Sequence, residues 1–141
     1  MSGREIKITL PLYVYLPRKR REDKIFRLNL NVYRNAHYQV LHQAKKEFFS
    51  ALLPQIEGIK KKGSVSPPPY KLLYVLFVPS TRRVDITNVC SILDKFACDV
   101  LVQAGVLRDD DAHTIAAVEY RFGGVDRGSP RCELIIKTVP G

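Results

Sequence analysis

The sequence predicts an α+β fold: a single domain with a mixed β-sheet and two main helices, in the order strand–strand–helix–strand–helix–strand–strand. Three observations predict it. Apolar residues alternate in the first third of the chain, they recur at helical spacing in two later segments, and a continuous apolar run lies between those segments. The length of 141 residues and the 45% hydrophobic content fit one folded domain over 1–141.

Two N-terminal segments alternate between apolar and polar residues. Residues 6–16 and residues 24–33 each predict a half-buried strand, and Pro11 indicates an edge or a break in the first of them. The charged residues 17–23 separate the two segments as a loop. We therefore expect the two strands to pair as a hairpin.

The first helix is predicted over residues 36–53, where apolar residues recur at helical spacing after Asn35, a favourable N-cap residue. Pro54 is expected to help end this helix because proline cannot donate the backbone hydrogen bond of a helix interior. Residues 57–69 show no period and are rich in Gly, Ser, Pro and Lys, which predicts an exposed loop.

The second half of the chain is predicted to begin with the central strand. The continuous apolar run of residues 72–78 is typical of a strand buried on both faces. A second helix is expected over about 88–104, with Gly105 at its C-terminal cap. Residues 114–122 and 131–138 predict two strands joined as a closing hairpin by a glycine-rich turn.

The charge of the chain is strongly positive but unevenly distributed. There are 23 Lys and Arg residues against 14 Asp and Glu residues, a net charge of +9. Residues 85–111, however, hold six of the acids and only two of the bases. The basic remainder is expected to attract polyanions, which the acidic segment repels unless a divalent cation lies between its carboxylates and phosphate. The alternative is a solvated acidic turn on a protein that is basic for solubility.

Other classes of protein are disfavoured. The longest apolar run, residues 72–78, is far shorter than the roughly 20 residues that span a bilayer, and the N-terminus has no apolar signal region. We therefore expect neither a membrane span nor secretion. Cys90, Cys98 and Cys132 are odd in number and lack metal-ligand spacing, so we expect a reducing compartment and no disulfide framework.

The polar groups that could carry chemistry flank the second predicted helix. The loop that leaves a buried strand commonly holds catalytic side chains. A helix of about 17 residues spans roughly 25 Å, so acids at its two ends meet only if the chain folds back or a following strand brings them together. The groups are Asp85 before the helix, a stripe of Asn88, Ser91, Lys95 and Asp99 along it, and Asp109, Asp110 and Asp111 after it.

Each of these groups also has an ordinary structural explanation. Asp85 is a natural N-cap residue, and residues 109–111 can form a polar turn before a strand. Arg82 and Arg83 can be ordinary surface charge. The basic run at residues 18–21 is typical of a solvated loop and by itself identifies no partner.

Three sequence segments follow one another in a recognisable order: RRVDITN at 82–88, a helix that ends in DVLVQAGV at 99–106, and three acids at 109–111. This arrangement resembles the RusA family of Holliday-junction resolvases. The family pattern is Arg-Arg-Asp-x-Asp-Asn, a short helix containing Ala-Gly, and then an Asp-Asp pair. The family also has strands and a helix before the motif and a closing pair of strands, and this order fits the chain. Only residues 82–111, however, carry motifs that are specific to the family.

Carried over by position, the resemblance makes Asp85 and Asp110 metal-binding acids and Lys95 the essential lysine. Thr87 occupies the place of the second family acid, and Asp109 or Asp111 could compensate for it. A hydroxyl is a much poorer magnesium ligand than a carboxylate. The residues expected to contact DNA are Arg82, Arg83, Asn88 and the loop residues Arg18, Lys19, Arg20 and Arg21.

The resemblance implies a homodimeric, Mg²⁺- or Mn²⁺-dependent endodeoxyribonuclease that makes paired nicks across a four-way (Holliday) DNA junction in recombination and repair. Its expected catalytic residues are Asp85, Asp110 and Lys95, and its expected location is the cytoplasm of a bacterial or phage-infected cell. The alternative is a non-catalytic module that binds branched DNA, which Thr87 in place of the second acid favours. A nuclease that acts on flaps with the same metal chemistry is a third, weaker alternative.

Overall fold

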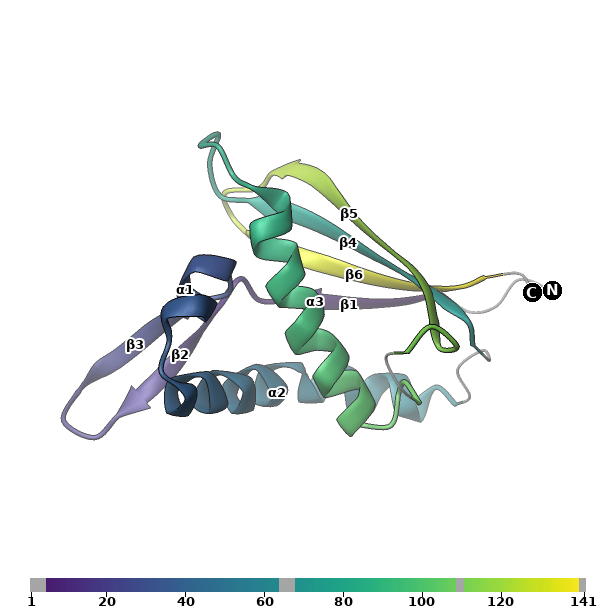
Figure 1. The fold of residues 1–141 in the computed structure, drawn as a ribbon, viewed down its shortest axis with the longest axis horizontal. Coiled ribbons are helices and arrows are strands. Elements are labelled where there is room, and N and C mark those ends of the chain that lie inside the picture. The colour runs from purple at the N-terminus through teal and green to yellow at the C-terminus, as the bar shows by residue number, and fades with distance from the viewer. Residues whose placement is uncertain (1–4, 64–67, 109–110, 140–141) are drawn as a thin grey trace.

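The computed structural model describes residues 5–63, 68–108 and 111–139. They form a single α+β domain, as predicted, with a four-stranded mixed sheet, a two-stranded hairpin and three helices (Figure 1). In chain order the elements are β1 (Ile6–Leu10), β2 (Tyr13–Arg18), β3 (Arg21–Arg27), α1 (Leu30–Asn35), α2 (Tyr38–Lys61), β4 (Tyr70–Val78), α3 (Ile86–Gln103), β5 (Ile115–Val125) and β6 (Arg131–Thr138).

Strand β4 lies in the interior of the sheet, whose order is β1-β6-β4-β5. It pairs antiparallel with β6 on one side and parallel with β5 on the other. Leu72, Tyr74 and Leu76 of β4 are completely buried, and Leu73 on the opposite face is nearly so. The predicted central position of this strand is therefore confirmed. Burial on both faces holds only in part, because Val75 and Phe77, on the face opposite the helices, are half-buried.

Helices α2 and α3 cross the same face of the sheet and enclose the core (Figure 1). Phe48 of α2 and Phe96 of α3 meet edge to face, with ring centroids 5.6 Å apart. The β2–β3 hairpin extends away from the sheet beside the first turns of α2 (Figure 1). Among the described helices, none is both long enough and apolar enough to cross a membrane.

The prediction of one strand over residues 6–16 was wrong, because this segment forms two strands with different partners. Strand β1 pairs with β6, whereas β2 pairs with β3 as the hairpin. Pro11 lies at the break, where it has no backbone N–H to offer a ladder. The predicted pairing of the two N-terminal segments is confirmed only for the second of the two strands.

The predicted strand over residues 24–33 ends at Arg27, and a short helix begins after Asn29. The Asn29 Oδ1 atom accepts a hydrogen bond from the Val32 backbone N–H at 2.9 Å, which caps α1. The apolar residues of this segment alternate over too few positions to distinguish a strand from one and a half helical turns.

Helix α2 continues past Pro54 to Lys61, beyond the predicted end at residue 53. Its buried residues, Ala44, Phe48, Leu52 and Ile56, are spaced four apart on both sides of the proline. Packing of this stripe against the sheet outweighs the one backbone hydrogen bond that proline removes. Part of the predicted 57–69 loop is therefore helical.

The two C-terminal strands lie where predicted but do not pair with each other. Strand β6 inserts between β1 and β4, whereas β5 lies on the other side of β4. The segment between them passes the end of β4, where the Asp126 N–H donates to the Val78 carbonyl at 2.8 Å. The predicted closing hairpin was wrong because alternation locates a strand without identifying its neighbour.

Tyr74 joins the sheet to α3 through a polar contact in the core. Its hydroxyl donates a 2.6 Å hydrogen bond to Asp94 Oδ1 and lies 3.9 Å from Cys98 Sγ. Burial raises the pKa of Tyr74 well above its ordinary value, so this hydroxyl keeps its proton. Asp94 thus faces the sheet, away from the exposed stripe of α3.

We predict that Tyr74→Phe lowers the free energy of unfolding by about 1.5–3 kcal/mol, the usual contribution of a hydrogen bond to a charged group. The matched control is Tyr120→Phe, because the Tyr120 hydroxyl makes no hydrogen bond with the described residues although its ring packs 5.8 Å from that of Tyr74. Urea denaturation measures both changes. Equal losses in the two variants would contradict a role for the Tyr74–Asp94 contact.

Candidate functional site

The candidate site lies at the carboxyl end of β4, where the chain leaves the sheet through residues 79–84 and enters α3. Asp85 is the N-cap of α3, and its Oδ1 accepts a hydrogen bond from the Asn88 N–H at 3.1 Å. The side chain of Asp85 remains exposed. Asp85 therefore has the structural role expected of an N-cap and is also accessible from outside.

A pocket of about 210 Å³ opens beside this loop. Its polar lining comes from two places in the chain: Arg27 ends β3 and Asn29 follows it, whereas Ser80, Arg82 and Arg83 belong to the β4–α3 loop. Guanidinium groups hold phosphate through paired hydrogen bonds. Three arginines in one small pocket form a cradle suited to a phosphate group.

Asn88 ties α3 to α1. Its Oδ1 accepts a hydrogen bond from the Leu30 N–H at 3.1 Å, at the beginning of α1. The side chain is half-buried. Asn88 was predicted to contact DNA, and the structure gives it a positioning role beside the pocket.

Lys95 lies on the exposed side of α3, with its Nζ 5.5 Å from the centre of the Tyr33 ring. It follows Asp85 by ten residues, which corresponds to roughly 15 Å along a helix. The structure therefore does not bring Lys95 to the arginine pocket of its own chain.

Asp111, the last residue of the predicted acidic turn, lies at the other end of the sheet. Asp109 and Asp110 fall outside the described residues. Asp111 Oδ1 accepts hydrogen bonds from the His113 and Thr114 N–H groups, each at 3.1 Å. The Thr114 carbonyl in turn accepts from the N–H of Tyr70, the first residue of β4, at 2.8 Å.

Asp85 and Asp111 are therefore not brought together within one chain. Asp111 lies beside the first residue of β4, and Asp85 follows its last residue. Nine residues of strand span roughly 26 Å. The same separation follows from α3, whose 18 residues connect the two ends.

The described residues of one chain do not form a complete magnesium site. Among them, no cluster of three or more His, Cys, Asp or Glu side chains could hold a metal ion. Asp85 is the single carboxylate of the 82–88 segment, and the neighbouring Thr87 offers a hydroxyl. Mg²⁺ is usually held by one or two carboxylates together with substrate phosphates, and at this place the described residues offer one carboxylate, Asp85.

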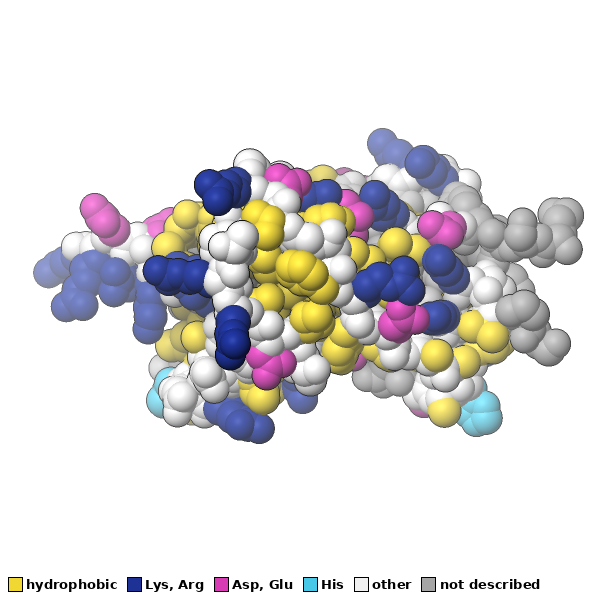
Figure 2. All heavy atoms as spheres, turned by 90° about the horizontal axis from the view of Figure 1, so that it is seen from above, with side chains coloured by type: hydrophobic (Ala, Val, Ile, Leu, Met, Phe, Trp, Pro, Cys, Tyr) yellow, Lys and Arg dark blue, Asp and Glu magenta, His cyan; other side chains and the backbone are white. Residues whose placement is uncertain are grey.

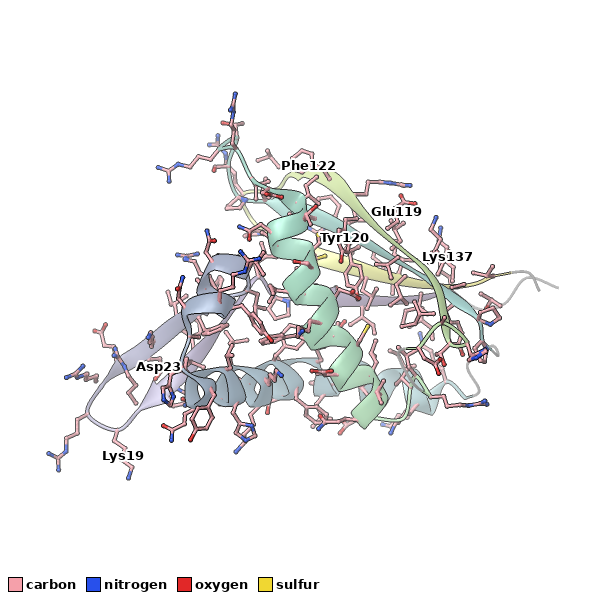
Figure 3. All side chains as sticks on the ribbon, in the orientation of Figure 1. Lys19, Asp23, Glu119, Tyr120, Phe122 and Lys137 are labelled. Atoms are coloured by element: carbon pink, nitrogen blue, oxygen red, sulfur yellow. The ribbon has the colours of Figure 1, made fainter. Side chains whose placement is uncertain are left out.

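The basic run predicted to bind DNA forms the tip of the β2–β3 hairpin, which projects from the body of the molecule (Figures 1 and 3). Figure 2 shows basic side chains gathered along this projection. The Arg18 Nε donates to the Glu22 carbonyl at 2.8 Å, which fixes the turn. The exposed basic residues are Arg18, Lys19, Arg20 and Arg21.

Two features were missed by the sequence reasoning. One is Arg27 in the pocket, which only the fold places beside Arg82 and Arg83. The other is a larger groove of about 910 Å³ between α2 and α3, spanned by the Lys45–Asp99 ion pair at 3.8 Å. Helical periodicity predicts which faces of the two helices are exposed. It does not predict how the helices cross, and that crossing creates the groove.

The fold and the site define a small basic α+β domain with an arginine pocket and one exposed carboxylate at the carboxyl end of its central strand. No protein-family model matches the chain, and no curated protein matches it significantly.

Proposed function

We propose that this chain is a divalent-metal-dependent endodeoxyribonuclease that resolves four-way DNA junctions as a homodimer, in the cytoplasm of a bacterial or phage-infected cell. The observation that carries the proposal is the pocket lined by Arg27, Arg82 and Arg83 beside the exposed Asp85. Arg82, Arg83 and Asp85 belong to the segment, residues 82–111, that resembles the RusA family.

In this proposal, some residues of the site bind DNA phosphates and others bind the metal ion. The arginines of the pocket hold a backbone phosphate without reading bases, and the basic hairpin tip holds the backbone of a neighbouring arm. Asp85 offers a carboxylate next to the held phosphate, and the resemblance assigns Asp110 as the second acid. A divalent ion between carboxylates and phosphate polarises the phosphate and lowers the pKa of a bound water.

The alternative function is a non-catalytic module that binds branched DNA. Two observations favour it. Thr87 stands where the family has its second acid, and Asp85 and Asp111 lie at opposite ends of β4 within one chain. Such a module keeps the salt dependence of phosphate binding but needs no metal.

Cleavage of a synthetic four-way junction, in the presence of Mg²⁺ or Mn²⁺, tests the proposal directly. We expect paired nicks near the branch point, and none in a linear duplex of the same sequence or in the presence of a chelator. Binding without nicks under either ion contradicts the nuclease and supports the binding module.

Replacing both Arg82 and Arg83 by alanine is predicted to weaken junction binding. Each lost phosphate contact reduces the slope of log affinity against log salt by about 0.9, so the double variant should lose nearly two units. Lys137→Ala is the control, because Lys137 is an exposed cation that pairs across the sheet with Lys71, far from the pocket (Figure 3). An unchanged slope in the double variant would show that Arg82 and Arg83 do not contact phosphates of the junction.

A further inference from the structure

The two faces of the β2–β3 hairpin differ sharply in burial. Successive side chains of a strand point to opposite faces, and the inward set, which includes Leu16 and Phe26, is buried in the core. On the outward face, Tyr13 is 39% exposed, Tyr15 is 50% exposed and Ile25 is 43% exposed. These three large side chains therefore contribute little to the core and are accessible from outside.

The two tyrosines form a defined aromatic surface. The centres of their rings lie 5.4 Å apart, and the rings meet edge to face at 84°. Ile25 lies opposite Tyr15 in the strand pairing and extends the same surface. The hydrogen bond with Tyr13 raises the pKa of Tyr15, so the Tyr15 hydroxyl carries no negative charge at neutral pH. The outer face thus offers flat, neutral rings to a planar ligand group.

The charge around these rings favours a polyanion as the ligand. Residues 13–27 contain six Lys and Arg residues against two acids, and Figure 2 shows basic side chains gathered on this projection. None of the ion pairs among the described residues involves this segment. Exposed aromatic rings set among cations are the combination with which proteins bind single-stranded nucleic acid.

Arg27 connects the aromatic surface to the arginine pocket. It lies directly opposite Tyr13 across the hairpin, where facing Cβ atoms are about 4.5–5.5 Å apart. It also lines the pocket together with Arg82 and Arg83. Because a nucleotide carries a phosphate and a planar base on one sugar, a single strand can place a phosphate in the pocket and a base on the rings.

We propose that Tyr13 and Tyr15 stack an unpaired base of a DNA strand whose phosphate is held at Arg27. In a duplex, neighbouring base pairs cover both faces of a base, so only an unpaired base can reach the rings. Stacking uses the π-face that every base has, so it selects unpaired nucleotides without selecting a sequence.

The substrate class follows from this contact, in a step that rests on the proposed function. The favoured substrate is a branched DNA with single-stranded nucleotides beside the branch point, rather than a junction that is paired throughout. The arginine pocket alone makes no such distinction, because phosphate contacts position a strand without reading its bases.

Binding of oligothymidylate, in the presence of a chelator, tests the stacking. We expect Tyr13→Ala/Tyr15→Ala to bind a short labelled oligothymidylate at least about fivefold more weakly than the parent, and a duplex of the same length within about twofold. Tyr13→Phe/Tyr15→Phe keeps both rings and should bind both ligands like the parent. Tyr38→Ala is the matched control, because Tyr38 is 71% exposed but belongs to α2.

Removal of the bases from the ligand provides an independent readout. An abasic oligomer keeps the sugar–phosphate backbone and lacks every stacking partner. The parent should bind it about as weakly as the double alanine variant binds oligothymidylate, and the alanine substitutions should cause no further loss. Such a cycle reports contact between rings and bases, since damage to the fold would weaken binding of both ligands.

The salt dependence of binding separates the role of Arg27 from that of the tyrosines. We expect Arg27→Ala to reduce the slope of log affinity for oligothymidylate against log salt by about 0.7, the value for one phosphate contact on a single strand. The double alanine variant should keep the slope of the parent, because the tyrosines contact no phosphate in this proposal. An unchanged slope in Arg27→Ala contradicts the phosphate contact.

The inference is overturned if the double alanine variant binds oligothymidylate like the parent, if the phenylalanine variant loses as much affinity, or if duplex binding falls equally. Tighter binding of oligouridylate than of oligothymidylate overturns it as well, because the surface then serves RNA. Circular dichroism confirms that each variant is folded.

These measurements use neither metal nor a junction, so they are independent of cleavage. A chain that stacks unpaired bases in this way but never nicks branched DNA refutes the proposed function alone. A chain that nicks junctions while its tyrosine variants bind single strands normally refutes the inference alone.

Discussion

Replacing Asp85 by asparagine is expected to abolish junction cleavage while leaving folding and junction binding close to those of the parent chain. Asparagine retains the Oδ1 atom that accepts the Asn88 N–H, and it caps helices about as well as aspartate. What it loses is the charge that holds a cation. Even replacement of a group that only supports a metal ligand costs 10–100-fold, so loss of the ligand should exceed about 100-fold.

The measurement combines cleavage rate, junction affinity and thermal stability. Asp99→Asn is the matched control, since it removes an exposed carboxylate near the other end of α3 that contacts Lys45. Its cleavage rate should stay within a few-fold of the parent. If Asp85→Asn cleaves normally, Asp85 holds no catalytic ion; if binding disappears together with cleavage, Asp85 acts on the substrate or the fold instead.

Sequence periodicity predicts an element correctly where the burial pattern of that element alone defines it. The buried run of β4, the apolar stripe of α3 and the alternation of β6 are all found within a few residues of their predicted bounds. The prediction was wrong where an outcome depends on tertiary packing, as when α2 continues through Pro54 because Ile56 is buried.

The candidate site was predictable only in part, for the same reason. Asp85 follows directly from the capping preference before α3, and the structure confirms that role. The position of Asp111 depends on the direction of β5. A strand–helix–strand unit normally gives parallel neighbours, which places the loop after the helix at the far end of the sheet. That rule, applied to β4, α3 and β5, separates Asp111 from Asp85.

The separation of Asp85 and Asp111 at opposite ends of β4 makes a second strong prediction for the proposed homodimer. We expect each of its sites to join Asp85 of one chain to the acids of the other chain. We expect chains carrying Asp85→Asn to be inactive alone, and likewise chains in which Asp109, Asp110 and Asp111 are all asparagine. Mixed, they should recover cleavage. One of the two sites in a mixed dimer joins the intact Asp85 of one chain to the intact acids of the other, while its second site carries both changes.

Random exchange makes about half of the dimers mixed, each with one intact site, so the recovered rate of single nicks should be about a quarter of that of the parent. Paired nicks should recover far less, since they need both sites. The control mixes Asp85→Asn chains with chains that carry both sets of changes, where no site retains Asp85. Recovery is impossible if each site belongs to one chain, because both changes then leave every site damaged. Mixed dimers that form, as shown by co-purification of two differently tagged chains, yet nick no junction would therefore place the acids in one chain or outside the reaction.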